Sequence, residues 1–351
     1  MSAPAEWLLL CLLLVAAAMS GAFARLLRLP PAPVAVLFGV LLARGPSAVL
    51  DARAAAALQP AASIALCVAA LVTGLKLTTP GTFLRERAAV APHLLAETVL
   101  VPALVWLALV LLGGVPAQVA LLVGLMALGS MADIVQQSAH RASGPAGSLI
   151  DALAAVARAD LAASLGLAMA AVFALRLHFD PPALAHGIEL PLAACSLGLG
   201  AALGSSAPGF MARFAAPAGR AFGFALAVCG TLAGATILPA LLPHALFIAT
   251  LAVSARLAGK LAAAAWGRRG TDAEGRARRA LLAGCALAPG GLLGVALILA
   301  VRHEPSLAGF ADMFLAVGVW IAVLNATLGP LLARPALARL VSRAAPPPGA
   351  C

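Results

Sequence analysis

Eleven apolar stretches fill most of the chain, and short segments rich in polar residues, proline or glycine separate them. A helix needs around 20 residues to cross about 30 Å of hydrocarbon, and each stretch approaches that length. Loop signals such as Leu29-Pro30-Pro31 and Gly45-Pro46-Ser47 lie between them. The pattern predicts an all-α polytopic membrane protein with spans at 6–27, 33–50, 59–78, 90–112, 117–140, 149–175, 188–206, 219–238, 241–265, 279–302 and 309–335.

The composition supports a protein dissolved in lipid rather than in water. Apolar residues make up 63% and charged residues 10% of the 351 positions, whereas a soluble domain is about half apolar and about a quarter charged. The lipid bilayer is therefore the expected main solvent and partner. The net charge of +10 does not indicate a nucleic-acid partner, because basic residues in such a chain usually mark cytoplasmic loops.

Basic residues are distributed unequally between the two sides of this topology. Loops that follow the odd-numbered spans hold sixteen Lys and Arg residues, and the opposite side holds four. The positive-inside rule places the richer side in the cytoplasm. We therefore expect a multi-pass protein of the cell (inner) membrane, with its N-terminus outside and its C-terminus in the cytoplasm. The first span follows Glu6 and lacks the basic start of a signal peptide, so we expect it to be retained.

The two halves of the chain repeat one another at an offset of 160 residues without gaps. The spans of 33–50 and 117–140, for example, match those of 188–206 and 279–302. Residues that match in this register are Pro31 with Pro191, Arg53 with Arg213, Gly74 with Gly234, Gly124 with Gly284, and Pro145 with Pro305.

Each repeat contains five spans, and an odd number inverts the second copy relative to the first. Inverted repeats around a midplane site are typical of secondary transporters. The predicted organisation is an extra N-terminal helix (1–28), a first five-helix repeat (29–178), a second repeat (188–337) and a cytoplasmic tail (338–351). Chance similarity between helices of low complexity is the alternative interpretation.

The fourth span of each repeat is interrupted near its centre by helix-breaking residues. The interruptions fall at 124–133 and 284–291, which are matching places in the repeat. Glycine and proline at matching depth predict crossing discontinuous helices, whose freed carbonyls can bind a cation. Close helix packing at glycine is the alternative. The residues assigned to the breaks are Gly129, Pro289, Gly290 and Gly291.

Asp160 is the most informative charged residue, because it lies eleven residues into its predicted span. That position is roughly 17 Å deep at 1.5 Å per residue, which is too deep for the side chain to reach the membrane surface. Its carboxylate needs a proton, a cation or a basic partner. Because burial disfavours the charged form, a proton and a cation can compete for it, as an antiporter requires. Asp133 lies just after the first break, and Arg158 is a neighbouring basic residue.

Other intramembrane charges have competing interpretations. Arg256 and Lys260 lie one helical turn apart on one face. Either side chain can extend to the cytoplasmic surface, and for Arg256 this explanation is as good as a functional one. His93 and Glu97 share a face and either pair with each other, line a helix interface or belong to the site.

Several segments, in order and with their spacing, resemble the monovalent cation:proton antiporter superfamily, which has the sodium/proton exchanger fold. The resemblance extends over nearly all of the chain. It rests on Leu29-Pro30-Pro31 through Gly45-Pro46-Ser47, Gly74-Leu75-Lys76-Leu77, Ala142-Ser143-Gly144-Pro145 before the helix of Asp160, Arg256-Leu257-Ala258-Gly259-Lys260, Leu287-Ala288-Pro289-Gly290-Gly291, and Leu328-Gly329-Pro330-Leu331-Leu332.

The resemblance implies exchange of Na⁺ or K⁺ for protons by alternating access, in a homodimer with a panel domain and a mobile core. Asp160 would bind the cation and the proton, with Asp133 and Ser130 in the unwound segment and Lys260 as charge partner. Three departures stand out: the family's usual Asn or Asp before Asp160 is Ala159, residues 130–134 lack the usual Thr and Pro, and the usual basic residue near Pro289 is absent.

Two other functions stay open. A sodium-coupled organic-anion symporter of the bile-acid type shares inverted five-helix repeats, and Gly74-Leu75-Lys76-Leu77-Thr78 fits it, but that class usually dispenses with a midplane Asp–Lys pair. A non-transporting sensor or scaffold would explain Ala159. An enzyme is not predicted, because we find no nucleophile–base set, nucleotide loop or metal-ligand spacing, the six cysteines included. No metal site or cofactor is expected besides the transported ions.

Overall fold

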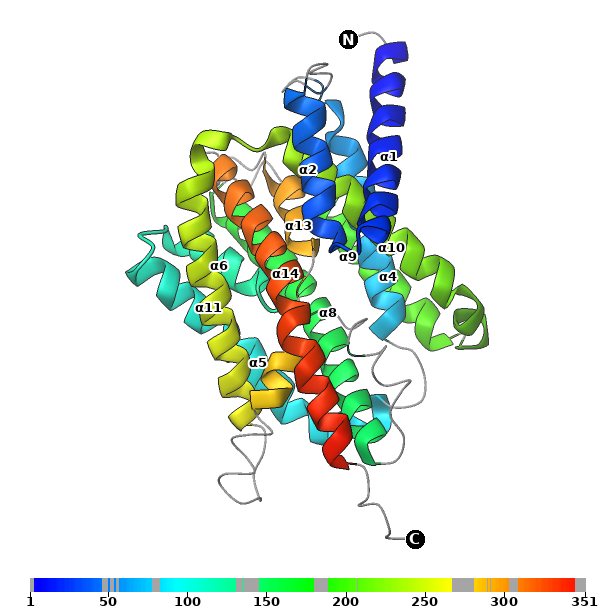
Figure 1. Ribbon diagram of the computed structural model, residues 1–351, viewed down its shortest axis with the longest axis vertical. Coiled ribbons are helices and arrows are strands. Elements are labelled where there is room, and N and C mark those ends of the chain that lie inside the picture. Colours follow the sequence, from blue (N-terminus) through cyan, green and yellow to red (C-terminus); the bar gives the residue numbers. More distant parts are fainter. Residues whose placement is uncertain are drawn as a thin grey trace.

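The computed structural model describes residues 3–45, 50, 54, 57–77, 83–130, 135, 145–179, 189–206, 208–266, 281–288, 290, 292–302 and 309–344. All regular secondary structure in these residues is helical. Seven of the described helices are long and apolar enough to cross a membrane. The fold is therefore that of an all-α polytopic membrane protein, as the sequence predicts (Figure 1).

The helices follow the predicted spans closely. The described helices of the first half are α1 (Ala3–Leu26), α2 (Pro31–Arg44), α4 (Gln59–Leu77), α5 (Phe83–Leu111), α6 (Ala117–Met126) and α8 (Pro145–Phe179). Those of the second half are α9 (Glu189–Ser206), α10 (Pro208–Thr236), the 3-10 helix η2 (Pro239–Leu241), α11 (Leu242–Trp266), residues 281–286, α13 (Leu293–Val301) and α14 (Ala311–Ala344). Four of them begin with proline, at Pro31, Pro145, Pro208 and Pro239. Proline suits a helix start because the first N–H groups of a helix have no partner within it, and proline lacks that N–H.

Both predicted helix breaks are present. Helix α6 ends at Met126, and the next four residues, 127–130, form a turn and coil. The helix of residues 281–286 ends in the same way, and α13 begins only at Leu293. Gly129 and Gly290 lie in the two breaks. Three residues assigned to this region from the sequence, Asp133, Pro289 and Gly291, fall outside the described residues.

The packing of the helices repeats with the same offset as the sequence. Helix α2 packs on α10, α4 packs on α9, and α5 packs on α11. Gly39 of α2 faces the α10 backbone at Thr231 and Ala235, and Gly200 of α9 faces the α4 backbone at Leu71 and Leu75. Residues 71 and 75 become 231 and 235 when moved by 160 positions, and residue 39 becomes 199, next to Gly200, so the two contacts are equivalent to within one residue.

The same equivalence holds for Gly74 and Gly234, which match in the sequence. Gly74 of α4 meets the backbone of α9 at Leu197, and Gly234 of α10 meets the backbone of α2 at Val36. A side chain at either glycine would overlap a backbone carbonyl. The helices of each half therefore pack in equivalent pairs against the other half, which supports two inverted repeats.

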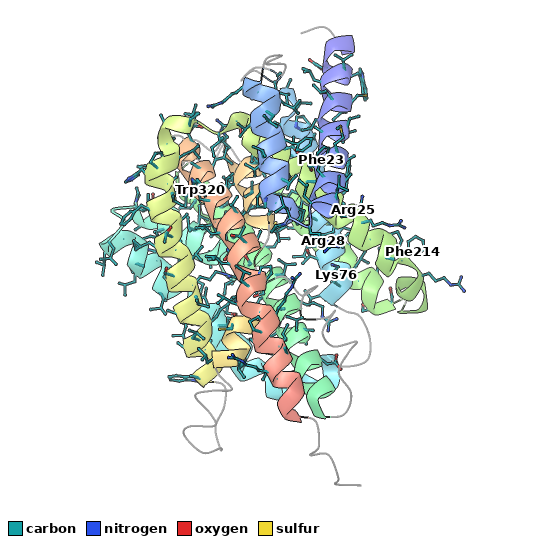
Figure 2. The ribbon with its side chains drawn as sticks, viewed as in Figure 1. Phe23, Arg25, Arg28, Lys76, Phe214 and Trp320 are labelled. Carbon is teal, nitrogen blue, oxygen red and sulfur yellow. The ribbon has the colours of Figure 1, made fainter. Side chains whose placement is uncertain are left out.

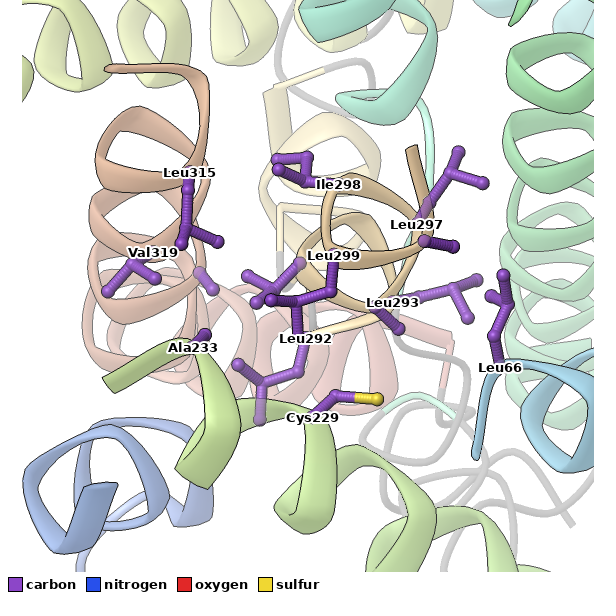
Figure 3. Close-up of a cluster of buried hydrophobic side chains, with 14 of the residues drawn as sticks. Leu66, Cys229, Ala233, Leu292, Leu293, Leu297, Ile298, Leu299, Leu315 and Val319 are labelled. Carbon is purple, nitrogen blue, oxygen red and sulfur yellow. The ribbon is translucent and has the colours of Figure 1, made fainter. Parts of the chain in front are cut away.

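Helix α13 occupies the centre of the apolar core. Figure 3 shows its side chains, among them Leu293 and Leu299, between Leu66 of α4, Cys229 of α10 and Leu315 of α14. Every residue of α13 except Gly294 is buried. The second half-helix of the second break is thus held from several sides, which fixes the point where the two broken helices meet.

Basic residues lie in the last turns of α1 and α4. Figure 2 shows Arg25, Arg28 and Lys76 close to the same level, and the Lys76 ammonium lies 5.0 Å from the ring centre of Phe222. The start of α1 and the end of α14 lie at opposite ends of the long axis (Figure 1). Helix α14 continues to Ala344, beyond residue 337 where the sequence places the end of the second repeat. The proposed domain boundaries stay predictions.

Candidate functional site

Asp160 lies near the middle of α8 and is fully buried. One of its oxygens, Oδ2, lies 3.1 Å from the Ser130 hydroxyl and 3.1 Å from the Lys260 ammonium. The other oxygen, Oδ1, is buried and has no hydrogen-bond partner among the described residues. The deep carboxylate predicted from the sequence therefore has one paired oxygen and one that remains available as an acceptor.

Lys260 of α11 joins three polar groups at one point. Its side chain is fully buried, and its Nζ donates to the Ser130 hydroxyl at 2.8 Å as well as to Asp160. It also forms an ion pair with Oε1 of Glu97. A buried ammonium is tolerated when carboxylates and hydrogen bonds surround it. The predicted Asp160–Lys260 pair is present, and Lys260 does not extend to the membrane surface.

Ser130 connects the two helix breaks. It lies in the coil after α6, and its hydroxyl is 3.1 Å from the carbonyl oxygen of Leu287 in the second break. The single hydroxyl proton can be donated either to this carbonyl or to Asp160, while the oxygen accepts from Lys260. Ser130 therefore lies between the carboxylate, the ammonium and the backbone of the second broken helix.

Arg256 lies one turn before Lys260 and spans the crossing of the broken helices. Its Nε donates to the carbonyl of Ala127 at 2.5 Å, and its Nη2 donates to the carbonyl of Gly129 at 3.0 Å. Its Nη1 donates to the carbonyl of Ala288 and, at 3.2 Å, to Oδ1 of Asn325 on α14. The side chain is 2% exposed, which contradicts an extension to the surface.

The position of Arg256 has a clear electrostatic reason. The carbonyls that it binds follow α6 and residues 281–286, so its positive charge lies at the negative ends of two helices. It also satisfies carbonyls that the breaks leave without helical partners. A basic group from α11 therefore lies beside both breaks.

Two further residues support the crossing and were not assigned to the site from the sequence. Asn325 is buried on α14 and accepts from Arg256. Ser164 lies one turn after Asp160, and its hydroxyl donates to the carbonyl of Leu125 at 2.9 Å. A polar residue within an apolar span is the sequence signal for both, but many serines in such helices bond only to their own backbone, as Ser196 does.

Glu97 and His93 of α5 extend the polar cluster. Glu97 is fully buried, and its Oε2 lies 3.4 Å from Nε2 of His93. The sequence offers pairing between these two residues as one interpretation, and this contact is present. The sequence does not indicate that Glu97 also contacts Lys260 across the α5–α11 interface. Arg158, the other suggested charge partner, is partly buried two residues before Asp160 and points to a different side of α8.

Two cavities lie near the crossing. A small one of about 30 Å³ is lined by Gly129, Arg256, Gly290 and Asn325, among others. A larger one of about 470 Å³ lies where α6, α11 and α14 begin. Both cavities are lined by Val123 and Phe314, so these residues separate the larger space from the crossing. Among the described residues, no group of His, Cys, Asp and Glu is arranged to hold a metal ion.

Comparisons with known proteins place this arrangement in a known fold. No family model and no curated protein matches the sequence. Among solved structures, the sodium proton antiporter MjNhaP1 from Methanocaldococcus jannaschii matches with a TM-score of 0.69 and 15% sequence identity. The match covers 96% of this chain and 98% of that chain. The predicted resemblance and fold class are therefore confirmed: the chain has the cation:proton antiporter fold.

Proposed function

We propose that this chain, which has the fold of a sodium/proton antiporter, exchanges a monovalent cation, Na⁺ or K⁺, for protons across the membrane by alternating access. The observation that carries the proposal is the buried Asp160 carboxylate, paired with Lys260 beside the crossing of two broken helices. The solved neighbour is a transporter and not an enzyme. Its ions come to this chain as part of the proposal.

The chemistry of the site fits competition between a proton and a cation. Na⁺ and K⁺ prefer oxygen ligands, and the Asp160 carboxylate, the Ser130 hydroxyl and carbonyls freed by the breaks are all oxygens. A cation at Asp160 excludes a proton there, and a proton removes the charge that holds the cation. Each time the site changes the side of the membrane to which it is open, it therefore carries either a proton or a cation.

Arg256 and Lys260 have different roles in this mechanism. Arg256 holds the crossing together through three backbone carbonyls, so its charge is committed to structure. Lys260 contacts the reacting carboxylate directly. When no cation is bound, its ammonium is the positive charge that pairs with Asp160. A proton or cation at Asp160 weakens that ion pair, which couples occupancy to a rearrangement of α8 against α11.

The decisive experiment compares the wild type with Asp160→Asn in proteoliposomes, with a fluorescent dye that reports internal pH. We expect Na⁺ or K⁺ to drive proton movement in the wild type and not in the variant. Glu6→Gln is the matched control, since it makes the same chemical change on exposed α1. Undiminished exchange in Asp160→Asn would overturn the assignment.

Two measurements on the same proteoliposomes, proton movement and uptake of an organic anion, separate the remaining candidates. Dequenching by Na⁺, K⁺ and Li⁺ in turn identifies the ion, and sodium-dependent uptake of an organic anion without proton movement would favour a symporter. The Asp160–Lys260 pair favours the antiporter, because symporters of the bile-acid type usually lack it. Cell-membrane location, an external N-terminus, a cytoplasmic C-terminus and a homodimer stay predictions. Light scattering of the purified protein tests the last of these.

A further inference from the structure

We propose that Gln59 is a latch, formed by its hydrogen bond to Leu299, which joins two groups of helices and favours the state of the transport cycle that the structure shows. The inference rests on the proposed function, because it concerns the movement by which the site changes sides. Gln59 is the first residue of α4, and its Nε2 donates to the carbonyl of Leu299 in α13 at 2.5 Å. The bond joins residues that are 240 positions apart in the chain.

The helices that the latch connects belong to different packing groups. One group contains α1, α2, α4, α9 and α10, and the other contains α5, α6, α8, α11, α13 and α14. The most extensive contact between the groups is that of α4 with α13. Asp160, Arg256 and Lys260 all lie in the second group. When the second group moves against the first to change the side of the site, the contact between α4 and α13 must therefore change.

The latch has a physical reason at the end of α13. This helix ends at Val301, so Leu299 lies in its last turn, where carbonyls lack a partner further along the helix. Leu299 is buried, and a buried carbonyl without a donor is costly. The amide of Gln59 supplies that donor. Leu58, next to Gln59, and Val301 are also buried, so the two groups are in close contact at this end of the molecule.

The second repeat has no residue that corresponds to the donor. In the register of 160 residues, Gln59 corresponds to Gly219 of α10. The register is exact for α4 and α10, because Gly74 and Gly234 take equivalent positions in them. Nothing lies within 4 Å of the Cβ that a larger residue would have at Gly219. Arg220 is exposed and lies about 100° further around the helix, so it does not replace the missing side chain.

Because the repeats are inverted, this difference makes the latch one-sided. The start of α4 lies on the side that the sequence predicts to be outside, and the contact equivalent to α4 with α13 closes the opposite side. A latch there would need a donor at residue 219. Its acceptor, residue 139, lies outside the described residues, but glycine offers no side-chain donor to any acceptor. The hydrogen bond of Gln59 therefore stabilises the state closed on the outside, without a counterpart for the state closed on the inside.

The effect of the latch on the cycle has a definite size and direction. One hydrogen bond of this kind changes the ratio of the two states by roughly 2- to 12-fold. The apparent dissociation constant of a ligand equals its intrinsic value divided by the fraction of protein that can bind it. When the outward-open state is the minor one, loss of the latch should lower the external cation concentration for half-maximal exchange by the same factor. The internal concentration should hardly change.

The test replaces Gln59 with methionine, which is of similar length and has no N–H donor. Gln118→Met is the matched control, because Gln118 is exposed near the start of α6. Spin labels at Leu41 and Phe247, which are exposed and lie in different groups, report the two states as distances in lipid nanodiscs, after replacement of the native cysteines by alanine. We expect Gln59→Met to move the population ratio roughly 2- to 12-fold away from the state closed on the outside, and Gln118→Met to keep the wild-type ratio.

The outcomes separate this inference from the proposed function, because the distance measurement needs no ion exchange. An unchanged ratio in Gln59→Met, or a shift toward the state closed on the outside, overturns the latch and leaves the antiporter intact. If Gln59→Met does not fold, Gln59→Asn keeps the amide one methylene shorter and should move the ratio in the same direction by a smaller factor. An unchanged ratio in that variant overturns the latch equally. Absence of cation-dependent proton movement in the wild type overturns the proposed function itself.

Discussion

Replacing Arg256 with methionine should destabilise the protein as strongly as breaking a buried ion pair does. The guanidinium makes four hydrogen bonds, to the carbonyls of Ala127, Gly129 and Ala288 and to the Asn325 side chain. Methionine fills a similar volume but leaves all four acceptors buried without this donor. Each orphaned buried acceptor costs about 1–3 kcal/mol, and some of this total is offset because the charge no longer has to be buried.

We estimate the net loss of stability at about 3–5 kcal/mol, which is the range for breaking a buried charged network. One kcal/mol shifts the melting temperature of a large domain by about 2–4 °C. Arg256→Met should therefore melt roughly 6–20 °C below the wild type in detergent. Fluorescence-detected size-exclusion chromatography after heating measures this shift, and the proteoliposome assay should show little exchange.

Arg44→Met is the matched control for this prediction. Arg44 is exposed, and its Nη2 donates to the single carbonyl of Ile237 at 2.5 Å. Water can replace that bond, so the expected loss is below about 1 kcal/mol. A third variant, Arg256→Lys, keeps the charge but cannot reproduce the planar guanidinium with its several donors. Its melting temperature should lie between those of Arg256→Met and Arg44→Met. If Arg256→Met and the wild type have the same melting temperature, the guanidinium does not stabilise the contact between the two broken helices.

Two further predictions follow from other contacts. Ser130→Ala removes the hydroxyl that lies between Asp160 and Lys260, and it should raise the cation concentration for half-maximal exchange several-fold, whereas Ser196→Ala, whose hydroxyl bonds to its own helix, should not. Gly39→Leu would drive a side chain into the α10 backbone and should prevent recovery of folded protein in detergent, whereas Gly198→Ala, with nothing within 4 Å, should be tolerated. Monodisperse Gly39→Leu protein would contradict the packing argument.

Much of the architecture was predictable because membrane spans are encoded locally. A run of apolar residues long enough to cross the bilayer must be helical, since lipid offers the backbone no hydrogen bonds. The breaks were also predictable from local sequence, because Gly129 and Gly290 follow the ends of helices at matching depths. The offset of 160 residues, which sequence identity alone supported weakly, reappears in the packing of Gly74 and Gly234.

The site was predictable only in part, because its contacts join helices that are distant in the sequence. Depth alone singled out Asp160, and helix spacing placed Arg256 beside Lys260. Neither signal tells which helix each side chain faces, so the role of Arg256 at both breaks and the contact of Glu97 with Lys260 were not foreseen. The described residues do not test the prediction for Asp133.

The paired glycine contacts between the halves have a consequence for how the protein is made. Helices α2 and α4 pack most extensively on α10 and α9, which belong to the other half. During synthesis the first repeat must therefore wait in the bilayer with the Gly39 and Gly74 surfaces unoccupied until residues 189–236 have been inserted. The two repeats therefore assemble by packing their helices against each other, and a chain that ends after α8 lacks α9 and α10, on which α4 and α2 pack.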